Sequence, residues 1–594
     1  MSDRTRQWLP WLLLAAAVIA TAAVYWPGVT GGWVFDDYPN IIDNAAIHIT
    51  RGHSTLVAWI NSALSSPSSF LRRPLASLTF SLNWYFGNGD PWPFKVTNIV
   101  IHLINGVLVF VMLRVLLRLV ALRGDIPPVL RTDPLPAEGG EQGRRATDFL
   151  PPSAGKAEGS ERARSARGDG FPRIDELAAT RLALIVSAAW MLLPINLMAV
   201  LYVVQRMESL CQIFVLAGLW AYLHGRWMML TATDARRDRR GFSLAVAGIV
   251  LGTLIGLTSK ETAVLLPVFA FLAEWILLRF AQNANPLSLR ERGRGEGTGT
   301  RDVANHRQGT FAPVTEPSPA PSGHPLPVGE GKVMPDRRIW TLFTVTLFVP
   351  AILGFAWLLR GVLRPSALAG RDFTLAQRLL TEPRVLVDYL HWTLLPNPMI
   401  LSLYHDEIVV STGLLSPWTT LGAIVLVTAL IVVAVLLRSR RPLVSLGIGW
   451  FFAAQLLTAT IIPLELVYEQ RMYFASIGVL LAAGALLLGL RWKIAWPLLR
   501  GFIVVIALLW FAVATNLRAR EWSNPLRLAV AEANRHPESA RAVYEAGRLL
   551  LIASNYQSGK VLDESWKYLR QAEAIPGASA LPDQAMIMIA DHHK

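Results

Sequence analysis

Residues 417–437 read PWTTLGAIVLVTALIVVAVLL, a stretch of 21 residues without a charged side chain. An α-helix rises about 1.5 Å per residue, so this stretch would be about 30 Å long, which matches the hydrocarbon core of a bilayer. That core offers no water to backbone N–H and C=O groups, whereas a helix satisfies them internally. The stretch therefore predicts a membrane-spanning helix.

Ten further stretches meet the same criterion of about 20 mostly apolar residues. They are 8–26, 95–118, 178–201, 208–230, 242–258, 262–280, 339–361, 442–463, 472–490 and 495–515, of which 242–258 and 442–463 are short or interrupted. The chain of 594 residues is 53% hydrophobic and 16% charged, whereas a soluble domain is about 25% charged. We therefore predict an all-α polytopic membrane protein with a bundle of about 11 transmembrane helices.

Basic residues predict the orientation, because cytoplasmic loops carry an excess of Lys and Arg. The first stretch follows Arg4 and Arg6 as in a signal peptide, but no small-residue cleavage site follows it, so we predict an uncleaved first helix. With the N-terminus in the cytoplasm, every dense basic cluster falls on the cytoplasmic side. These clusters are Arg114/Arg118/Arg123, Arg236/Arg237/Arg239/Arg240, Arg337/Arg338, Arg438/Arg440/Arg441 and Arg491/Lys493.

Composition also argues against several classes of function. The net charge of +14 could suggest a nucleic-acid partner, but the basic residues lie in short clusters between apolar stretches, so we predict none. Cys211 is the single cysteine, which excludes an internal disulfide framework and a cysteine metal cluster. The chain has no Walker A sequence, no Gly-rich dinucleotide turn and no GxSxG, so nucleotide-driven chemistry lacks support.

Two low-complexity segments divide the chain. Residues 124–176 and 282–338 are rich in Pro, Gly, Arg and Glu without apolar periodicity, so we predict disordered cytoplasmic loops. The remaining segments are 1–123 with two spans and the external loop 27–94, 177–281 with spans three to six, and 339–515 with spans seven to eleven and the external segment 362–416.

The tail, residues 516–594, is predicted to be external and helical. Two amphipathic stretches, PESARAVYEAGRLLL and DESWKYLRQAEAIPG, resemble one tetratricopeptide repeat. The matching residues are Tyr544, Gly547 and Leu550 in the first helix, then Ala572 and Pro576. Because an independent array usually needs three repeats, we predict a small helical cap on the membrane domain, with protein docking as the alternative.

An acidic pair follows the first span. The external loop begins GGWVFDDYPNIIDN at residues 31–44, with Asp36 and Asp37 in an otherwise apolar setting. A carboxylate at a membrane surface is a functional candidate, as a base or a metal ligand. A helix-capping Asp is an equal alternative.

Charged pairs recur at turns on the same predicted side. VVQRMESL places Arg206 and Glu208 there, LTSKETAVLLP places Lys260 and Glu261, and PLELVYEQRMYFASIG places Glu465, Glu469 and Arg471. Arg72 and Arg73 precede a Pro in the first loop, and His102 lies in the second span. Each alone could be interfacial anchoring or a snorkelling pair. Together they predict a polar chamber with cations for phosphate and carboxylates for acid–base work.

Residues 376–406 are amphipathic and too polar for a span, so they could lie along the interface. They contain His391, His405 and Asp406, for which a metal site is conceivable although the spacing is not diagnostic. A divalent metal could assist at the acidic pair, but the sequence does not require one.

An ordered set of motifs resembles a known family. FDDYPNIIDN, RRPLASLTFSLNWYFGNGDPWPFKVTNIVIHLIN, QRMESL, SKETAVLLP and YEQRMYFASIG, followed by a helical tail, resemble the transmembrane and tetratricopeptide-repeat O-mannosyltransferases and their bacterial relatives. These are GT-C glycosyltransferases. The resemblance covers most of 24–120, 178–280 and 380–594, and the tail is much shorter than the family's repeat array.

The resemblance implies a GT-C-like bundle in a bacterial inner membrane, a polyprenyl-phosphate sugar donor, and transfer to a protein or glycan hydroxyl on the periplasmic or lumenal side. It implies that Asp36 or Asp37 is the base, and it maps the family's charged turn residues onto Arg206, Glu208, Lys260, Glu261, Glu469 and Arg471. Two alternatives stay open. A transporter or flippase of lipid-linked sugars predicts polar residues in mid-span, and a non-catalytic scaffold predicts dispensable turns.

Overall fold

The computed structural model describes residues 3–124, 176–282, 335–362, 371–489 and 496–592. The two segments predicted to be disordered, 124–176 and 282–338, lie almost entirely outside these residues. Within the described part the chain is helical and forms no β-strand, so the predicted all-α class is confirmed.

Nine helical segments among the described residues are long and apolar enough to cross a bilayer. They are built from α1 (Asp3–Tyr25), α4 (Pro91–Gly124), α8 (Arg206–Leu230), α9 (Ala235–Leu257), α10 (Leu266–Ala273), α12 (Arg337–Phe343) with α13 (Val349–Val362), α15 (Thr419–Leu437), α17 (Met472–Gly489) and α18 (Trp496–Glu521). A tenth candidate joins α6 (Glu176–Leu192) to Pro194–Leu201 with a bend of 54°. Each corresponds to a stretch predicted from hydropathy, and the chain is an integral membrane protein.

The stretch 442–463 differs from the prediction. Its helix, α16, covers only Pro442–Ala454, and 13 residues reach about 20 Å, less than the hydrocarbon core. The backbone beyond α16 is irregular. Its carbonyl groups accept hydrogen bonds from the Arg378 guanidinium, which donates to Thr460 O at 2.9 Å, to Leu464 O at 2.6 Å and to Thr458 O. Non-helical backbone in a membrane protein is tolerated where protein groups satisfy its polar atoms.

Small residues let neighbouring spans approach closely. A Cβ on Gly225 of α8 would lie 2.4 Å from the carbonyl oxygen of Gly241 in α9, and a Cβ on Gly447 of α16 would lie 2.4 Å from that of Gly478 in α17. Close backbone contact gives dispersion energy that lipid cannot replace, so such residues favour helix pairing in membranes.

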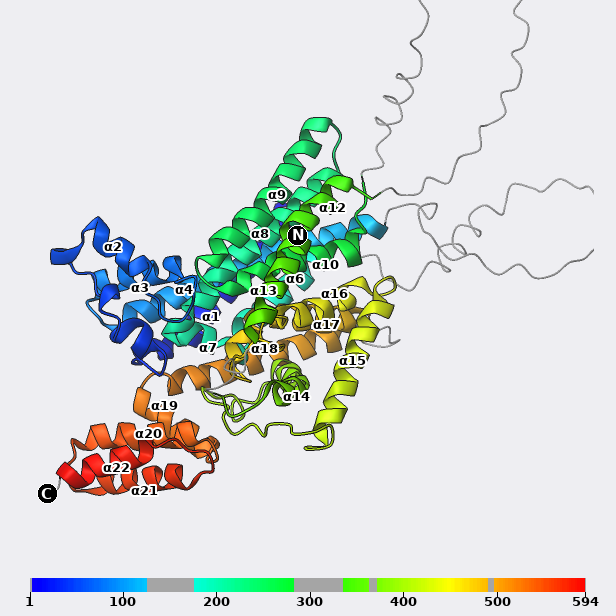
Figure 1. The fold of residues 1–594 in the computed structure, drawn as a ribbon. Helices are drawn as coiled ribbons and strands as arrows, with labels where there is room; N and C mark the ends of the chain where they lie inside the picture. The colour runs from blue at the N-terminus through cyan, green and yellow to red at the C-terminus, as the bar shows by residue number, and fades with distance from the viewer. Residues whose placement is uncertain (1–2, 125–175, 283–334, 363–370, 490–495, 593–594) are drawn as a thin grey trace, which may run out of the picture.

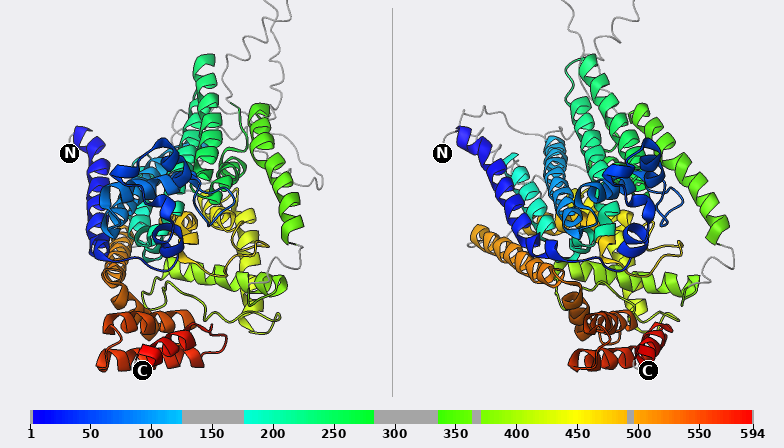
Figure 2. Two further views of the ribbon diagram at one scale, coloured as in Figure 1. Left: turned by 60° about the vertical axis from the view of Figure 1, so that its left-hand side comes forward. Right: turned by 90° about the vertical axis from the view of Figure 1, so that its left-hand side faces the viewer.

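One end of the bundle carries most of the irregular structure. We call it the tail side: α1 ends there at Tyr25, and the four tail helices α19 (Pro525–Arg535), α20 (Ala540–Ser554), α21 (Lys560–Ala574) and α22 (Leu581–His592) lie on it (Figure 1). The short helices α2 (Leu56–Ala63) and α3 (Pro74–Gly87) belong to the loop after α1. The amphipathic helix α14 (Leu375–Leu394) is not a span, and it runs across the bundle between the spans and the tail (Figure 2).

The opposite end of the bundle holds the basic clusters. Arg118 near the end of α4 pairs with Glu176, and Arg338 of α12 donates to Asp238 of α9 at 2.8 Å. The first turns of α9, which contain four arginines, also lie at this end (Figure 1).

Candidate functional site

The loop after α1 is folded tightly onto the end of α18. A Cβ on Gly31 would lie 1.9 Å from the carbonyl oxygen of Trp522, so this close approach requires glycine. Phe35 follows in the left-handed region with φ of 39°. This turn directs the two neighbouring carboxylates, Asp36 and Asp37, into different surroundings.

Asp37 is fully buried and holds the loop in place. The backbone N–H of Val204 donates to Oδ1 at 2.7 Å, and that of Val34 donates to Oδ2 at 3.1 Å. Burial raises the pKa of Asp37 to about 7, while these two hydrogen bonds and the charge of Lys95 act in the opposite direction. Its contacts tie the first loop to the turn just before α8, which is a structural role.

Asp36 is only partly buried. Its backbone N–H donates to the Tyr202 hydroxyl at 2.7 Å. Burial raises the pKa of this carboxyl group, Tyr202 and the charge of Arg541 lower it, and Glu465 raises it. A partly accessible carboxylate whose basicity is increased by burial can serve as a general base.

Arg73 of the first loop lies beside the turn that contains Lys260 and Glu261. Arg73 Nη2 forms an ion pair with Glu261 Oε2 at 2.9 Å, and Ser69 Oγ donates to the other oxygen of Glu261. Arg72 is exposed, and both arginines have positive φ, 59° and 43°. Backbone strain of this kind often accompanies functional turns.

A second pair joins the start of α8 to the same turn. Lys260 Nζ lies 3.1 Å from Glu208 Oε2, and it also donates to Gln205 Oε1 at 3.4 Å. Gln212 donates to the other oxygen of Glu208 at 2.7 Å. Tyr202, whose hydroxyl accepts the hydrogen bond from the Asp36 backbone, precedes Gln205 by three residues in the chain.

Two of the predicted ligand-binding residues have their polar atoms engaged inside the protein. Arg206 is fully buried and donates to Asn98 Oδ1 at 2.6 Å, Phe94 O at 2.8 Å and Thr79 O at 3.0 Å. His102 is buried with one ring nitrogen 2.8 Å from the Tyr473 hydroxyl and the other 2.9 Å from Met191 O. Both side chains connect helices, so we leave them out of the proposed binding site.

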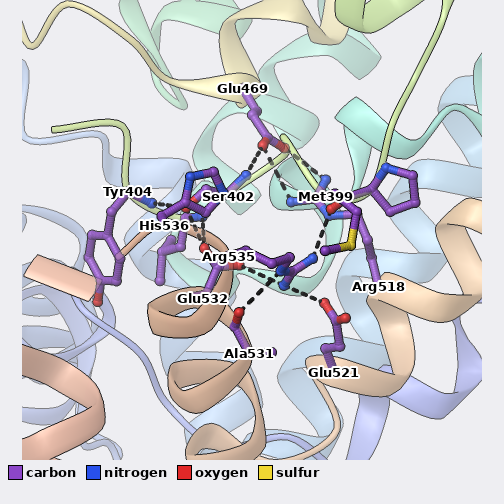
Figure 3. A network of polar contacts seen from close by, with 12 residues as sticks. Met399, Ser402, Tyr404, Glu469, Arg518, Glu521, Ala531, Glu532, Arg535 and His536 are labelled. Carbon is purple, nitrogen blue, oxygen red and sulfur yellow. Dashed lines mark hydrogen bonds and ion pairs between the residues drawn. The ribbon is translucent and has the colours of Figure 1, made fainter. Parts of the chain in front are cut away.

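Glu469 is the centre of a buried polar network (Figure 3). Arg518 of α18 lies 2.8 Å from Glu469 Oε2, and the backbone N–H of Ser402 donates to Oε1 at 2.7 Å. His405 Nε2 lies 3.5 Å from the same oxygen. Glu469 therefore holds the segment after α14 against the bundle and is not open to a ligand.

The turn before α17 also contains accessible charge. Arg471 donates to the carbonyls of Leu466 at 2.8 Å and Glu465 at 2.6 Å. The Glu465 carboxylate pairs with Arg371 at 2.6 Å and with Arg541 of the tail at 3.5 Å, and its side chain is 29% exposed. The charge of Glu465 also raises the pKa of Asp36.

The histidines considered for a metal do not gather. His405 stacks on Trp392 with ring centroids 4.9 Å apart, and Asp406 accepts hydrogen bonds from Ser539 and the Arg541 backbone. Within the described ranges, no group of three or more His, Cys, Asp or Glu side chains is placed to hold a metal ion.

Several residues that contact or act on Asp36, Asp37 or Glu465 were not found by sequence reasoning. They are Lys95, Tyr202, Arg371, Tyr468 and Arg541. Tyr468 could have been considered, since it directly precedes Glu469. Arg541 offered no signal, because its position near Asp36 depends on how the distant tail folds back.

Comparison with known proteins finds a local similarity. The protein O-mannosyl-transferase TMTC3 of Mus musculus is 34% identical over 96 residues, which is 15% of this chain and 10% of the mouse protein. The TMTC3 of Homo sapiens is 33% identical over 91 residues, or 14% and 10%. The matched region thus covers about a tenth of these curated relatives, so the similarity supports a loose relationship. No protein-family model and no solved structure matches the chain.

Proposed function

We propose that this chain is a membrane glycosyltransferase that moves a sugar from a polyprenyl-phosphate donor to an acceptor hydroxyl on the tail side. One observation carries the proposal: Asp36 is a partly accessible carboxylate at the end of the first span, next to Tyr202 and close to the charges of Glu465 and Arg541. The local similarity to proteins named O-mannosyl-transferases supports the same chemistry.

The reaction is a single displacement. Asp36 takes the proton of the acceptor hydroxyl, whose oxygen forms a bond to the anomeric carbon of the donor sugar. The bond from that carbon to the phosphate oxygen breaks, and its electron pair leaves with the phosphate. The products are an inverted glycoside, polyprenyl phosphate, and a protonated Asp36 that returns its proton to solvent.

In this proposal, two cations neutralise the leaving phosphate. Arg72 is exposed in the first loop, and Lys260 is 19% exposed beside Glu208. The guanidinium group suits bidentate binding of phosphate, and the ammonium group acts as a point charge. A preorganised cation stabilises charge that develops in the transition state.

The orientation proposed for this reaction places the tail side in the periplasm of a bacterial inner membrane. Its support is the gathering of basic residues at the opposite end, including Arg118 and Arg338, since such clusters mark cytoplasmic loops. The acceptor in this proposal is a hydroxyl group on a protein or a glycan.

The transporter alternative finds less support in the spans. It requires polar side chains along a path through the membrane. His102 and Asn105 lie in mid-span on α4, but they are buried and bonded to Tyr473, Met191 and Ser209. Their engagement favours a role in helix packing.

Asp36→Asn tests the proposal in the full-length protein. In vesicles containing radiolabelled polyprenyl-phosphate mannose, we expect sugar release or transfer to fall by about 10²- to 10⁴-fold, the usual contribution of a general base. Asp43→Asn, an exposed carboxylate of the same loop, is the matched control and keeps wild-type activity. Full activity of Asp36→Asn would refute the assigned base, and movement of intact donor across the membrane without cleavage would favour the transporter.

A further inference from the structure

The tail is docked on the segment that follows α14 through buried polar contacts (Figure 3). Glu532 of α19 is fully buried and accepts hydrogen bonds from the backbone N–H of Leu403 at 3.1 Å and from Ser402 Oγ. Arg535 donates to Pro398 O at 2.8 Å and pairs with Glu521 at 2.7 Å. Burying these groups is favourable only while they remain paired, so the contacts hold the tail in one position.

The same segment is held from the other side by the bundle. Ser402 donates its backbone N–H to Glu469 of the turn before α17, and its hydroxyl donates to Glu532 of the tail. Ser402 is therefore held between two buried carboxylates, one from each part. The tail is thus positioned relative to the turn that contains Glu465 and Glu469.

This docking fixes the start of α20. Asp406 accepts hydrogen bonds from the Arg541 backbone N–H at 3.1 Å and from Ser539 Oγ, the hydroxyl that caps the helix. The Arg541 side chain then reaches Glu465, with Nη2 3.5 Å from Oε1. The Arg541 side chain remains 46% exposed, so it is not fully buried in the contact between the tail and the bundle.

We propose that Arg541 is a positioning residue of the active site, supplied by the tail, which holds the Glu465 carboxylate in place through their ion pair. The inference rests on the function proposed above and extends it, because it makes the tail a part of the catalytic machinery. In this role Arg541 keeps the base ionised and Glu465 oriented while the acceptor is bound.

The charges around Asp36 support this role. Arg541 lowers the pKa of Asp36 and Glu465 raises it, so the two partners have opposite influences on the same carboxyl group. Asp36 also faces Tyr202, Tyr468 and its neighbour Asp37, and Arg471 lies close to Tyr468. None of these other groups belongs to the tail.

The test compares the pH dependence of sugar release in four full-length variants. Arg541→Gln moves the acid limb of the profile to higher pH and lowers the rate on that limb by about two- to five-fold, the size expected for a half-exposed charge. Glu465→Gln moves the limb to lower pH. Arg541→Lys keeps the charge, so its acid limb lies near that of the wild type. Arg570→Gln changes an exposed arginine of α21 and leaves the acid limb unchanged.

The outcomes separate this inference from the proposed function. If Asp36→Asn abolishes activity while Arg541→Gln keeps the wild-type profile, the role of Arg541 is refuted and the glycosyltransferase assignment stands. If Asp36→Asn is fully active, the proposed base is wrong whatever Arg541 does. Equal loss of activity at every pH in Arg541→Gln, with an unmoved limb and a normal elution volume in detergent, would assign it a structural role.

Discussion

The loop after α1 and the turn before α17 are far apart in sequence, but in each a buried carboxylate lies within a few residues of a more accessible one. In the loop, Asp37 accepts two backbone N–H bonds and Asp36 stays partly accessible. In the turn, Glu469 pairs with Arg518 at 2.8 Å, whereas Glu465 is 29% exposed. The buried member secures the chain so that the accessible member is held in a defined place.

The comparison separates two meanings of a charged residue near a membrane surface. A buried carboxylate whose hydrogen bonds are all formed contributes to the stability of the fold. If one member of a buried ion pair is removed, the other is left as a buried charge that neither solvent nor a partner stabilises. Substitution of an accessible carboxylate costs the protein little stability. The surroundings of such a group can instead adjust its pKa. Substitutions in the two regions should therefore divide into loss of folding and loss of function.

Glu469→Gln should give the largest loss of stability. It leaves Arg518 buried without a countercharge, and breaking a buried pair costs about 3–5 kcal/mol. Thermal unfolding in detergent measures the effect, with the exposed Glu538→Gln as control. A variant as stable as wild type would remove Glu469 from the network that holds the tail-side segment.

Asp37→Asn should have the next largest effect. An amide offers one acceptor oxygen to the N–H groups of Val34 and Val204, so one is left unpaired at a cost of about 1–3 kcal/mol. Denaturant unfolding at neutral pH provides the measurement. Asp36→Asn should change the same free energy of unfolding by less than about 0.5 kcal/mol. Equal losses in both variants would contradict the division of roles.

The sign of the pH dependence sharpens this prediction. The pKa of Asp37 is raised to about 7 in the folded protein, above the ordinary range near 4. The folded state therefore binds more protons than the unfolded state between these values, so this residue makes stability fall as pH rises from about 4 to about 7. In Asp37→Asn, the free energy of unfolding should depend less on pH in this range. An unchanged slope would show that other groups cause the pH dependence.

The spans could be predicted from the sequence because the hydropathy signal is contained within each helix. The early end of α16 could not be predicted. The backbone carbonyls that follow the helix are satisfied by Arg378, a residue about 80 positions earlier in the chain. Similarly, the acidic pair was found, but nothing local distinguishes Asp36 from Asp37. Their difference depends on Val204 and Tyr202, which the fold brings to the loop.

The charged turns show the same limit. Residue type and spacing indicated a polar chamber, but they could not show that Arg206 and Glu469 would be buried with full sets of partners. Arg541 is the opposite case: it is an ordinary residue of an amphipathic helix whose position matters only after the tail docks. Long-range pairing, which decides both cases, leaves no mark in a single sequence.

Glu465→Gln should cause the smallest change in stability. Its partners Arg371 and Arg541 are 30% and 46% exposed, and ion pairs in contact with solvent contribute about 0–1 kcal/mol. In thermal unfolding, Glu465→Gln should therefore have a midpoint temperature near that of the wild type, whereas Glu469→Gln, four residues later, should have a clearly lower one. If Glu465→Gln instead unfolds as readily as Glu469→Gln, both carboxylates of the turn are structural. Glu465 would then not correspond to Asp36, and the comparison between the two regions would fail.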